Sequence, residues 1–280
     1  MLKRIGGYVA TLAAAAILGL LAFDRAAPDG SPGNSPFAPF GALAHGDFGP
    51  MTTGSDPVVG RLVEALSITL PLLLLALTLA GLIALPLGVW AARRRSPVAA
   101  LAQLGAAAPA LVMALLLALL AGRAGLPPGG FASWHDNLPV AFGMLALPAI
   151  AAALPMAALL TLDVRDGLRE VEGAGFILAA QARGLTAEQA KRQHGRRGVA
   201  VAVLAGFGPR LALLAGGVYA AEAAFKLPGV SGLVAAGMAG HHPLLVLAGT
   251  MAFATVLATA VLLLDLLRAL VDPRIATRVA

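Results

Sequence analysis

The side chains that could do chemistry in this chain are few, and their spacing forms no catalytic centre. The chain has 5 histidines, 3 lysines and no cysteine. The absence of cysteine excludes a disulfide framework, a thiolate zinc site and a cysteine nucleophile. A phosphate-binding loop needs Gly-x-x-x-x-Gly-Lys-Ser/Thr, and none of the lysines follows a glycine. The sequence therefore predicts no catalytic residue, and ATP hydrolysis would need a separate subunit.

The histidines contain one adjacent pair, His241 and His242. None of the five histidines forms a His-x-x-x-His or Glu-x-x-His pattern on a helix. Adjacent residues point to different helix faces, so the pair is a poor chelate by itself. Two interpretations stay open, a metal-handling pair and an ordinary polar interfacial loop. We expect no resident metal and no other cofactor.

The composition sets the class of protein that must hold these residues. The chain has 280 residues, of which 59% are hydrophobic and 12% charged, and its mean hydropathy is +0.86. An ordinary soluble domain is about 25% charged. So few charges cannot cover the surface of a soluble enzyme of this size, and disorder needs the opposite balance. An integral membrane protein remains.

Six apolar stretches reach the length of about 20 residues that a helix needs to cross a bilayer core. They cover residues 5–23, 66–92, 97–121, 138–162, 199–221 and 243–264. Because spanning segments must satisfy their own backbone hydrogen bonds, we predict an all-α polytopic fold. The first stretch follows Lys3 and Arg4, so a cleaved signal peptide is the alternative to an uncleaved helix.

The distribution of positive charge orients these six helices. With both termini in the cytoplasm, 15 of the 20 Lys and Arg residues fall on cytoplasmic segments and 4 outside. We divide the chain into an N-terminal helix with a Pro/Gly-rich external loop, 1–45, and a core that holds the other five predicted helices, 46–280. The core contains one large cytoplasmic loop, 163–198. Nothing in this charge pattern requires a nucleic-acid partner.

The cytoplasmic loop carries the most informative pattern. Gly184 suits the left-handed position after a first short helix, and Thr186 with Gln189 has the spacing of a capping box that begins a second. The apolar residues before Gly184 have no obvious core of their own. Docking of a partner protein and contact with anionic membrane lipid both explain this segment.

This loop resembles the EAA coupling loop of ABC importer permeases of the dipeptide/oligopeptide/nickel group. The similarity extends in order over residues 46–276, and the matching segments are 46–49, 56–58, 147–149, 176–185, 222–232 and 272–275. The chain looks like the B-type half of the permease pair. It departs from the family's usual pattern at residues 108–111, in the third helix, and at Leu178 and Gln181, where Arg is common.

The resemblance implies the ABC importer type I permease fold and a set of partners. These are a second homologous permease, two ATP-binding subunits and an external solute-binding protein, in a bacterial inner membrane. The residues it assigns to ATPase coupling are Phe176, Ile177, Leu178, Ala179, Ala180, Ala182, Arg183, Gly184 and Leu185. It implies transport of peptides or related small solutes, including nickel chelates, without naming the cargo.

Two ionisable residues on the fifth predicted helix are candidates for the translocation path. A charge within a membrane is costly, so such residues are functional candidates by default. Arg210 either lines the path or reaches the cytoplasmic interface. Glu222 either faces the pore mouth and the binding protein or serves as a structural cap. Asp163 lies at the predicted end of the fourth helix, where it needs no special role.

Two other classes of protein compete with the importer. An ATP-independent secondary transporter predicts internal repeats and charges near the bilayer midplane. The sequence shows no convincing repeat, and Arg210 is its one candidate for a buried charge. A membrane-embedded enzyme is opposed by the missing catalytic constellation.

Overall fold

The computed structural model describes residues 58–92, 96–125, 130–132, 134, 137–172, 182–184, 186, 189, 196–240 and 243–271. All regular structure in this part of the chain is helical. The elements are α3 (Val58–Ala92), α4 (Val98–Ala107), α5 (Ala110–Arg123), α6 (Leu138–Glu172), α9 (Arg196–Ala224), α10 (Val230–Ala239) and α11 (Pro243–Val271). The predicted first span and its external loop lie outside the described residues.

Several helices have the length and apolarity of membrane spans. Three qualify individually, at Val58–Ala92, Leu138–Val171 and Leu245–Leu266, and α4 with α5 would supply a fourth. Each corresponds to a predicted stretch. Most of the long helices, however, run further than the apolar signal: α3 begins at Val58 rather than 66, and α6 continues to Glu172 rather than ending at 162. A regular helix continues beyond its apolar segment wherever its backbone bonds stay satisfied.

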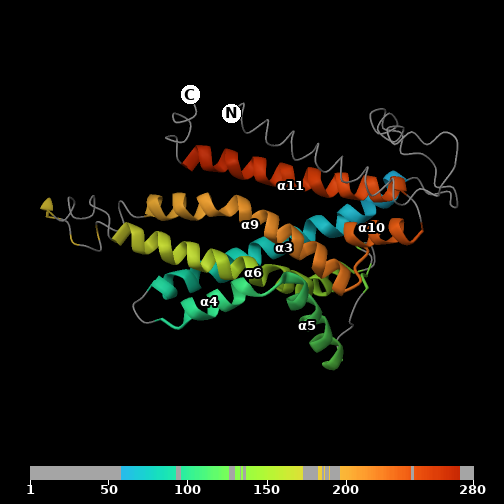
Figure 1. Ribbon diagram of the computed structural model, residues 1–280, viewed down its shortest axis with the longest axis horizontal. Helices are drawn as coiled ribbons and strands as arrows, with labels where there is room; N and C mark the ends of the chain where they lie inside the picture. The colour runs from blue at the N-terminus through green and yellow to red at the C-terminus, as the bar shows by residue number, and fades with distance from the viewer. Residues whose placement is uncertain are drawn as a thin grey trace.

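The third predicted helix, 97–121, is wrong as a single rod. It breaks at Ala108 and Pro109 into α4 and α5, which meet at 98°. Both residues at the break are extended, with ψ of 125° and 132°. Proline lacks an N–H group and disfavours the helical conformation of the residue before it. As a result α5 projects from the bundle (Figure 1).

Helix α6 occupies the middle of the bundle, packed against α3, α4, α5 and α9. Its buried face is built largely from alanine, with Leu145, Met156 and Leu160 adding volume. Small residues let neighbouring helices approach closely. A Cβ atom on Gly217 of α9 would lie 3.2 Å from the carbonyl oxygen of Ala152 on α6.

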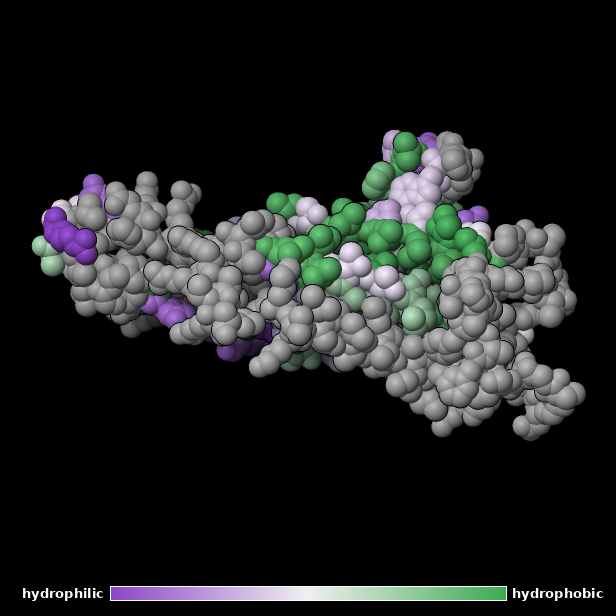
Figure 2. Space-filling view, turned by 90° about the horizontal axis from the view of Figure 1, so that it is seen from above, coloured by the Kyte–Doolittle hydropathy of each residue, from purple (hydrophilic) through white to green (hydrophobic). Residues whose placement is uncertain are grey.

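Outside this core, the described surface is strongly apolar. Exposed leucines lie along α3, α4 and α5, among them Leu74, Leu82, Leu104 and Leu119. In Figure 2, apolar side chains gather over the middle of the molecule, and strongly hydrophilic ones lie toward one end of its long axis. This distribution fits helices whose middle faces lipid.

A glycine substitution tests the close approach of α3 to α6. A Cβ atom on Gly88 would overlap the Val164 side chain, whereas Gly81, two turns earlier on α3, has nothing within 4 Å. Overpacking of this kind costs roughly 1–3 kcal/mol. We expect Gly88→Val to lower the thermal unfolding temperature of the purified protein in detergent, and Gly81→Val to leave it nearly unchanged. Equal effects of the two variants would contradict the packing described here.

Candidate functional site

At the C-terminal end of α9, the chain turns sharply towards α10. The Leu227 N–H donates to the Glu222 carbonyl at 2.9 Å, and the Lys226 N–H donates to the Ala223 carbonyl at 3.4 Å. These two bonds form a Schellman motif, in which Lys226 takes the left-handed position with φ of 50°. The motif satisfies the last carbonyl groups of α9 and directs the chain back over the bundle.

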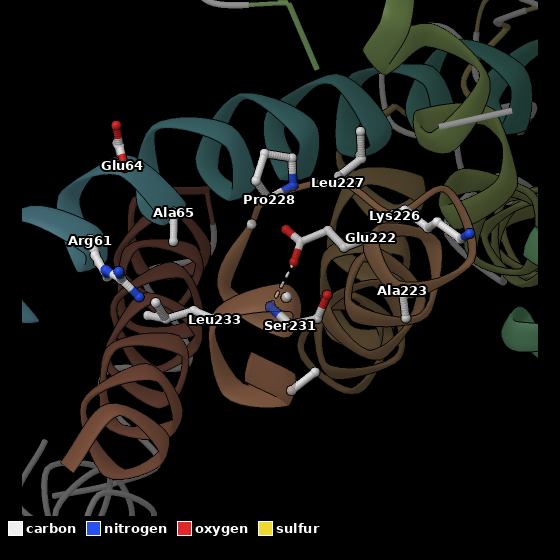
Figure 3. Close-up of a pocket in the computed structure, with 13 residues that line it drawn as sticks. Arg61, Glu64, Ala65, Glu222, Ala223, Lys226, Leu227, Pro228, Ser231 and Leu233 are labelled. Atoms are coloured by element: carbon white, nitrogen blue, oxygen red, sulfur yellow. Dashed lines mark hydrogen bonds between the residues drawn. The ribbon is translucent and has the colours of Figure 1, made fainter. Parts of the chain in front are cut away.

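The Glu222 side chain lies at the centre of this turn and is 1% exposed. Its Oε1 accepts a hydrogen bond from the Thr69 hydroxyl at 2.6 Å, and its Oε2 accepts one from the Ser231 N–H at 2.8 Å (Figure 3). The Val230 N–H donates to Thr69 Oγ1 at 3.0 Å. Two residues from other helices thus satisfy the first two N–H groups of α10.

Gly229 explains why α10 needs hydrogen-bond acceptors from Thr69 and Glu222, and how the Glu222 carboxylate fits beside it. Gly229 is the N-cap of α10 and has no side chain to accept those hydrogen bonds. A Cβ atom at this position would overlap the Glu222 carboxylate. Because Gly229 has no side chain, the N-terminus of α10 needs an acceptor from elsewhere. The same absence leaves the space that the Glu222 carboxylate fills. A carboxylate at a helix N-terminus is also favoured by the helix dipole.

A cavity of about 670 Å³ lies beside this network. It is lined from α3 by Arg61, Glu64 and Ala65, and otherwise by residues 222–235 of the turn and α10. In Figure 3, Glu222 points inward between the helices, whereas the Lys226 and Glu64 side chains point away from the centre. The cavity thus has a buried acid at its base and a charged rim.

The second polar contact between helices joins α9 to α6. Arg210 Nε and Nη2 donate to the two oxygens of Asp163 at 3.2 and 3.0 Å. Both side chains are mostly buried, 27% and 20% exposed respectively. The expectation that Asp163 needs no role at a helix end is wrong, because α6 continues past it to Glu172 and its carboxylate is the partner of Arg210.

The loop predicted to be cytoplasmic is described only in part. Gly184 has φ of 90°, as predicted for a glycine that ends a short helix. The capping box is also confirmed: the Thr186 N–H donates to Gln189 Oε1 at 3.0 Å, and the Gln189 N–H donates to Thr186 Oγ1 at 3.3 Å. Ala182 and Arg183 are exposed beside Gly184. The other coupling candidates, Phe176, Ile177, Leu178, Ala179, Ala180 and Leu185, lie outside the described residues, as do His194, His241 and His242.

The structure brings the sequence candidates into two separate places. Arg210 and Glu222 lie on α9 at different heights, each with a partner on another helix. Sequence reasoning missed those partners, Asp163 and Thr69. They are 47 and 153 residues from the candidates they bind, so no local spacing could reveal them. Among the described residues, no group of three or more metal-ligating side chains occurs.

The long apolar helices, three of which are long enough to cross a bilayer, are those of a polytopic membrane protein. Residues 84–277 match the family described as binding-protein-dependent transport system inner membrane component. The chain therefore belongs to this family, as its resemblance to the importer permeases predicts. The match begins near the end of α3 and includes α6, the loop that follows it, α9 and α11.

Several curated relatives share most of the chain. A putative peptide transport system permease protein of Brucella abortus is 31% identical over 241 residues, covering 83% of this chain and 76% of the relative. The oligopeptide transport system permease protein of Salmonella typhimurium is 30% identical over 241 residues, with coverage of 83% and 77%. The dipeptide transport system permease protein of Lactococcus lactis is 27% identical over 227 residues, with coverage of 79% and 73%.

A double-mutant cycle tests the hydrogen-bond network that joins Thr69 and Glu222 to the N-terminus of α10. We expect Thr69→Val and Glu222→Gln each to destabilise the protein by about 1–3 kcal/mol, because each leaves a buried partner of α10 poorly satisfied. The two effects should be coupled by about 0.5–3 kcal/mol, since both residues serve one network. The measurement is thermal unfolding of the single and double variants in detergent. Glu64→Gln, on the exposed rim of the same cavity, is the control, and strictly additive effects would argue against the network.

Proposed function

We propose that this chain is the transmembrane permease subunit of an ATP-driven importer for peptides or related small solutes. The observation that carries the proposal is the family match over residues 84–277. The relatives named as peptide, oligopeptide and dipeptide permeases support the substrate class. The ATP-independent transporter gains no support from these relatives.

The assembly follows from what the chain lacks and from the family description. The sequence has no phosphate-binding loop, so two separate ATP-binding subunits would supply the energy. A family described as binding-protein-dependent favours an external solute-binding protein as the donor of cargo. A second homologous permease would complete the path. The whole would span a bacterial inner membrane, with six helices in this chain and both its termini in the cytoplasm.

The mechanism is alternating access driven through the cytoplasmic loop. Phe176 to Leu185 would contact the ATP-binding subunit, with Gly184 forming the turn that sets the angle between the two short helices. ATP binding shifts the permease only if the contact differs between the inward-facing and outward-facing states. The reciprocal bonds between Thr186 and Gln189 suit that purpose, because they hold these two residues together when the loop is displaced.

The two polar contacts on α9 would lie at opposite ends of the translocation path. Arg210 remains 27% exposed and would contribute polarity to the inner part of the wall. Glu222, beneath the external cavity, would hold the outer mouth in shape through α10. The cavity's mixed charges suit peptides, which carry both an ammonium and a carboxylate group.

Reconstitution tests the proposed function directly. In proteoliposomes that contain this chain with its partner permease and ATP-binding subunits, we expect uptake of labelled dipeptides or oligopeptides. That uptake should require ATP and the external binding protein. Uptake by this chain alone, driven by an ion gradient and indifferent to ATP, would instead establish a secondary transporter.

A second prediction concerns the coupling loop. Gly184→Glu places a side chain at φ of 90°, where only glycine is relaxed. Because coupling free energies are worth about 5- to 150-fold, we expect peptide uptake to fall at least about fivefold while the permease stays in the membrane. Gly125→Glu is the matched control, with φ of 74° and equally open surroundings after α5. Normal uptake by Gly184→Glu, or equal losses in both variants, would refute a coupling role for this turn.

A further inference from the structure

The two helices that flank the cytoplasmic loop are α6, which ends at Glu172, and α9, which begins at Arg196. Any displacement of the loop therefore enters the rest of the permease through these two helices. They are also close neighbours in the bundle (Figure 1). Whether they move together or apart depends on the contacts between them.

The contact between α6 and α9 that lies farther from the loop is nondirectional. Gly217 of α9 lies against the backbone of Ala152, so close that a Cβ atom added to the glycine would be only 3.2 Å from the Ala152 carbonyl oxygen. Such a contact lets two backbones approach closely. It contains no hydrogen bond that would fix their rotation. The packing around it is extensive, but packed helices without directional bonds can still slide and rotate slightly against each other.

The contact nearer the loop, between Arg210 and Asp163, is directional. Arg210 lies seven residues from Gly217, about 10 Å along α9 towards the cytoplasmic loop. Its guanidinium forms two parallel bonds with the Asp163 carboxylate. A bidentate pair fixes orientation as well as distance. Its distance from the glycine contact gives it leverage against any pivoting of α6 and α9.

The same stretch of α6 also reaches α3. Arg169 Nε and Nη2 lie 3.4 and 3.5 Å from the carbonyl oxygens of Ala92 and Ala91, at the end of α3. By contrast, Arg165 pairs with Asp166, its neighbour on α6 itself. The loop end of α6 is thus linked by polar contacts to α3 and α9, and the Arg210–Asp163 pair is the tighter of these links.

We propose that Arg210 and Asp163 are positioning residues, whose ion pair makes α6 and α9 move as one unit when the ATPase displaces the loop between them. This inference rests on the proposed function. Without the pair, displacement of the loop would shift α6 and α9 relative to each other instead of reorienting both helices together. ATP would still be hydrolysed, but less cargo would cross per ATP.

The test measures coupling in the complete complex. Asp163→Asn and Arg210→Gln should each lower the number of peptides transported per ATP hydrolysed by roughly 2- to 30-fold, the range seen for residues that carry coupling. The charge-reversed double variant Asp163→Arg with Arg210→Asp should recover much of that ratio. Asp166→Asn is the matched control, since it makes the same substitution three residues on, at a carboxylate that pairs within α6.

A second measurement keeps the test sharp if a variant assembles poorly. The chain has no cysteine, so spin labels at Glu170→Cys and Val203→Cys report the separation of α6 and α9 directly. With the pair intact, we expect one narrow distance distribution with and without ATP. Loss of the pair should broaden it.

The possible outcomes separate the two proposals. An unchanged transport-to-ATP ratio in the single variants overturns the positioning role, as does a reduced ratio that the charge-reversed double variant fails to raise. A narrow distance distribution in Asp163→Asn overturns it as well. Failure of the unmodified complex to couple ATP to uptake would overturn the proposed function itself.

Discussion

The carboxylate of Glu222 meets a requirement of every buried helix end, where each N–H and C=O group without a partner in its own helix needs another one. The chain leaves α9 through a Schellman motif and enters α10 through acceptors supplied by Thr69 and Glu222. Because those acceptors belong to α3 and α9, satisfying α10 also fixes its place. The same requirement limits the break between α4 and α5 to Ala108 and Pro109, one of which has no N–H group to satisfy.

Charge is scarce in this chain, and the structure uses it mainly to join elements. Within the bundle, Arg210 meets Asp163 from a neighbouring helix. Near the C-terminal end of α6, Arg169 lies beside the last carbonyl groups of α3, where the helix dipole favours a cation. The glycine contacts bring helices close without specifying their angle, whereas these polar contacts are directional. Close packing and directional bonding are therefore divided between different residues of the same helices.

The sequence was sufficient for features that depend on neighbouring residues. Apolar length predicted the positions of α3, α6 and α11, glycine predicted the turn at 184, and spacing predicted the capping box of Thr186 and Gln189. It was insufficient where the outcome depends on residues far apart in the chain. A proline in an apolar run does not by itself predict a break, since Pro71, Pro86 and Pro148 lie inside continuous helices whereas the chain breaks at Pro109. The partners of Glu222 and Arg210 emerge only when three helices are placed side by side.

The 98° bend has a consequence for the lipid around the protein. Helix α5 has 14 residues, so its axis is about 21 Å long, compared with about 30 Å for the hydrocarbon of a typical bilayer. Its leucines at 111, 115 and 119 are all at least half exposed. Helix α5 alone is therefore about 9 Å too short to cross the bilayer, and the bent pair of α4 and α5 either forms one broken span or enters and leaves on the same side. Either arrangement leaves the half-exposed leucines of α5 to be covered by lipid or by another protein surface.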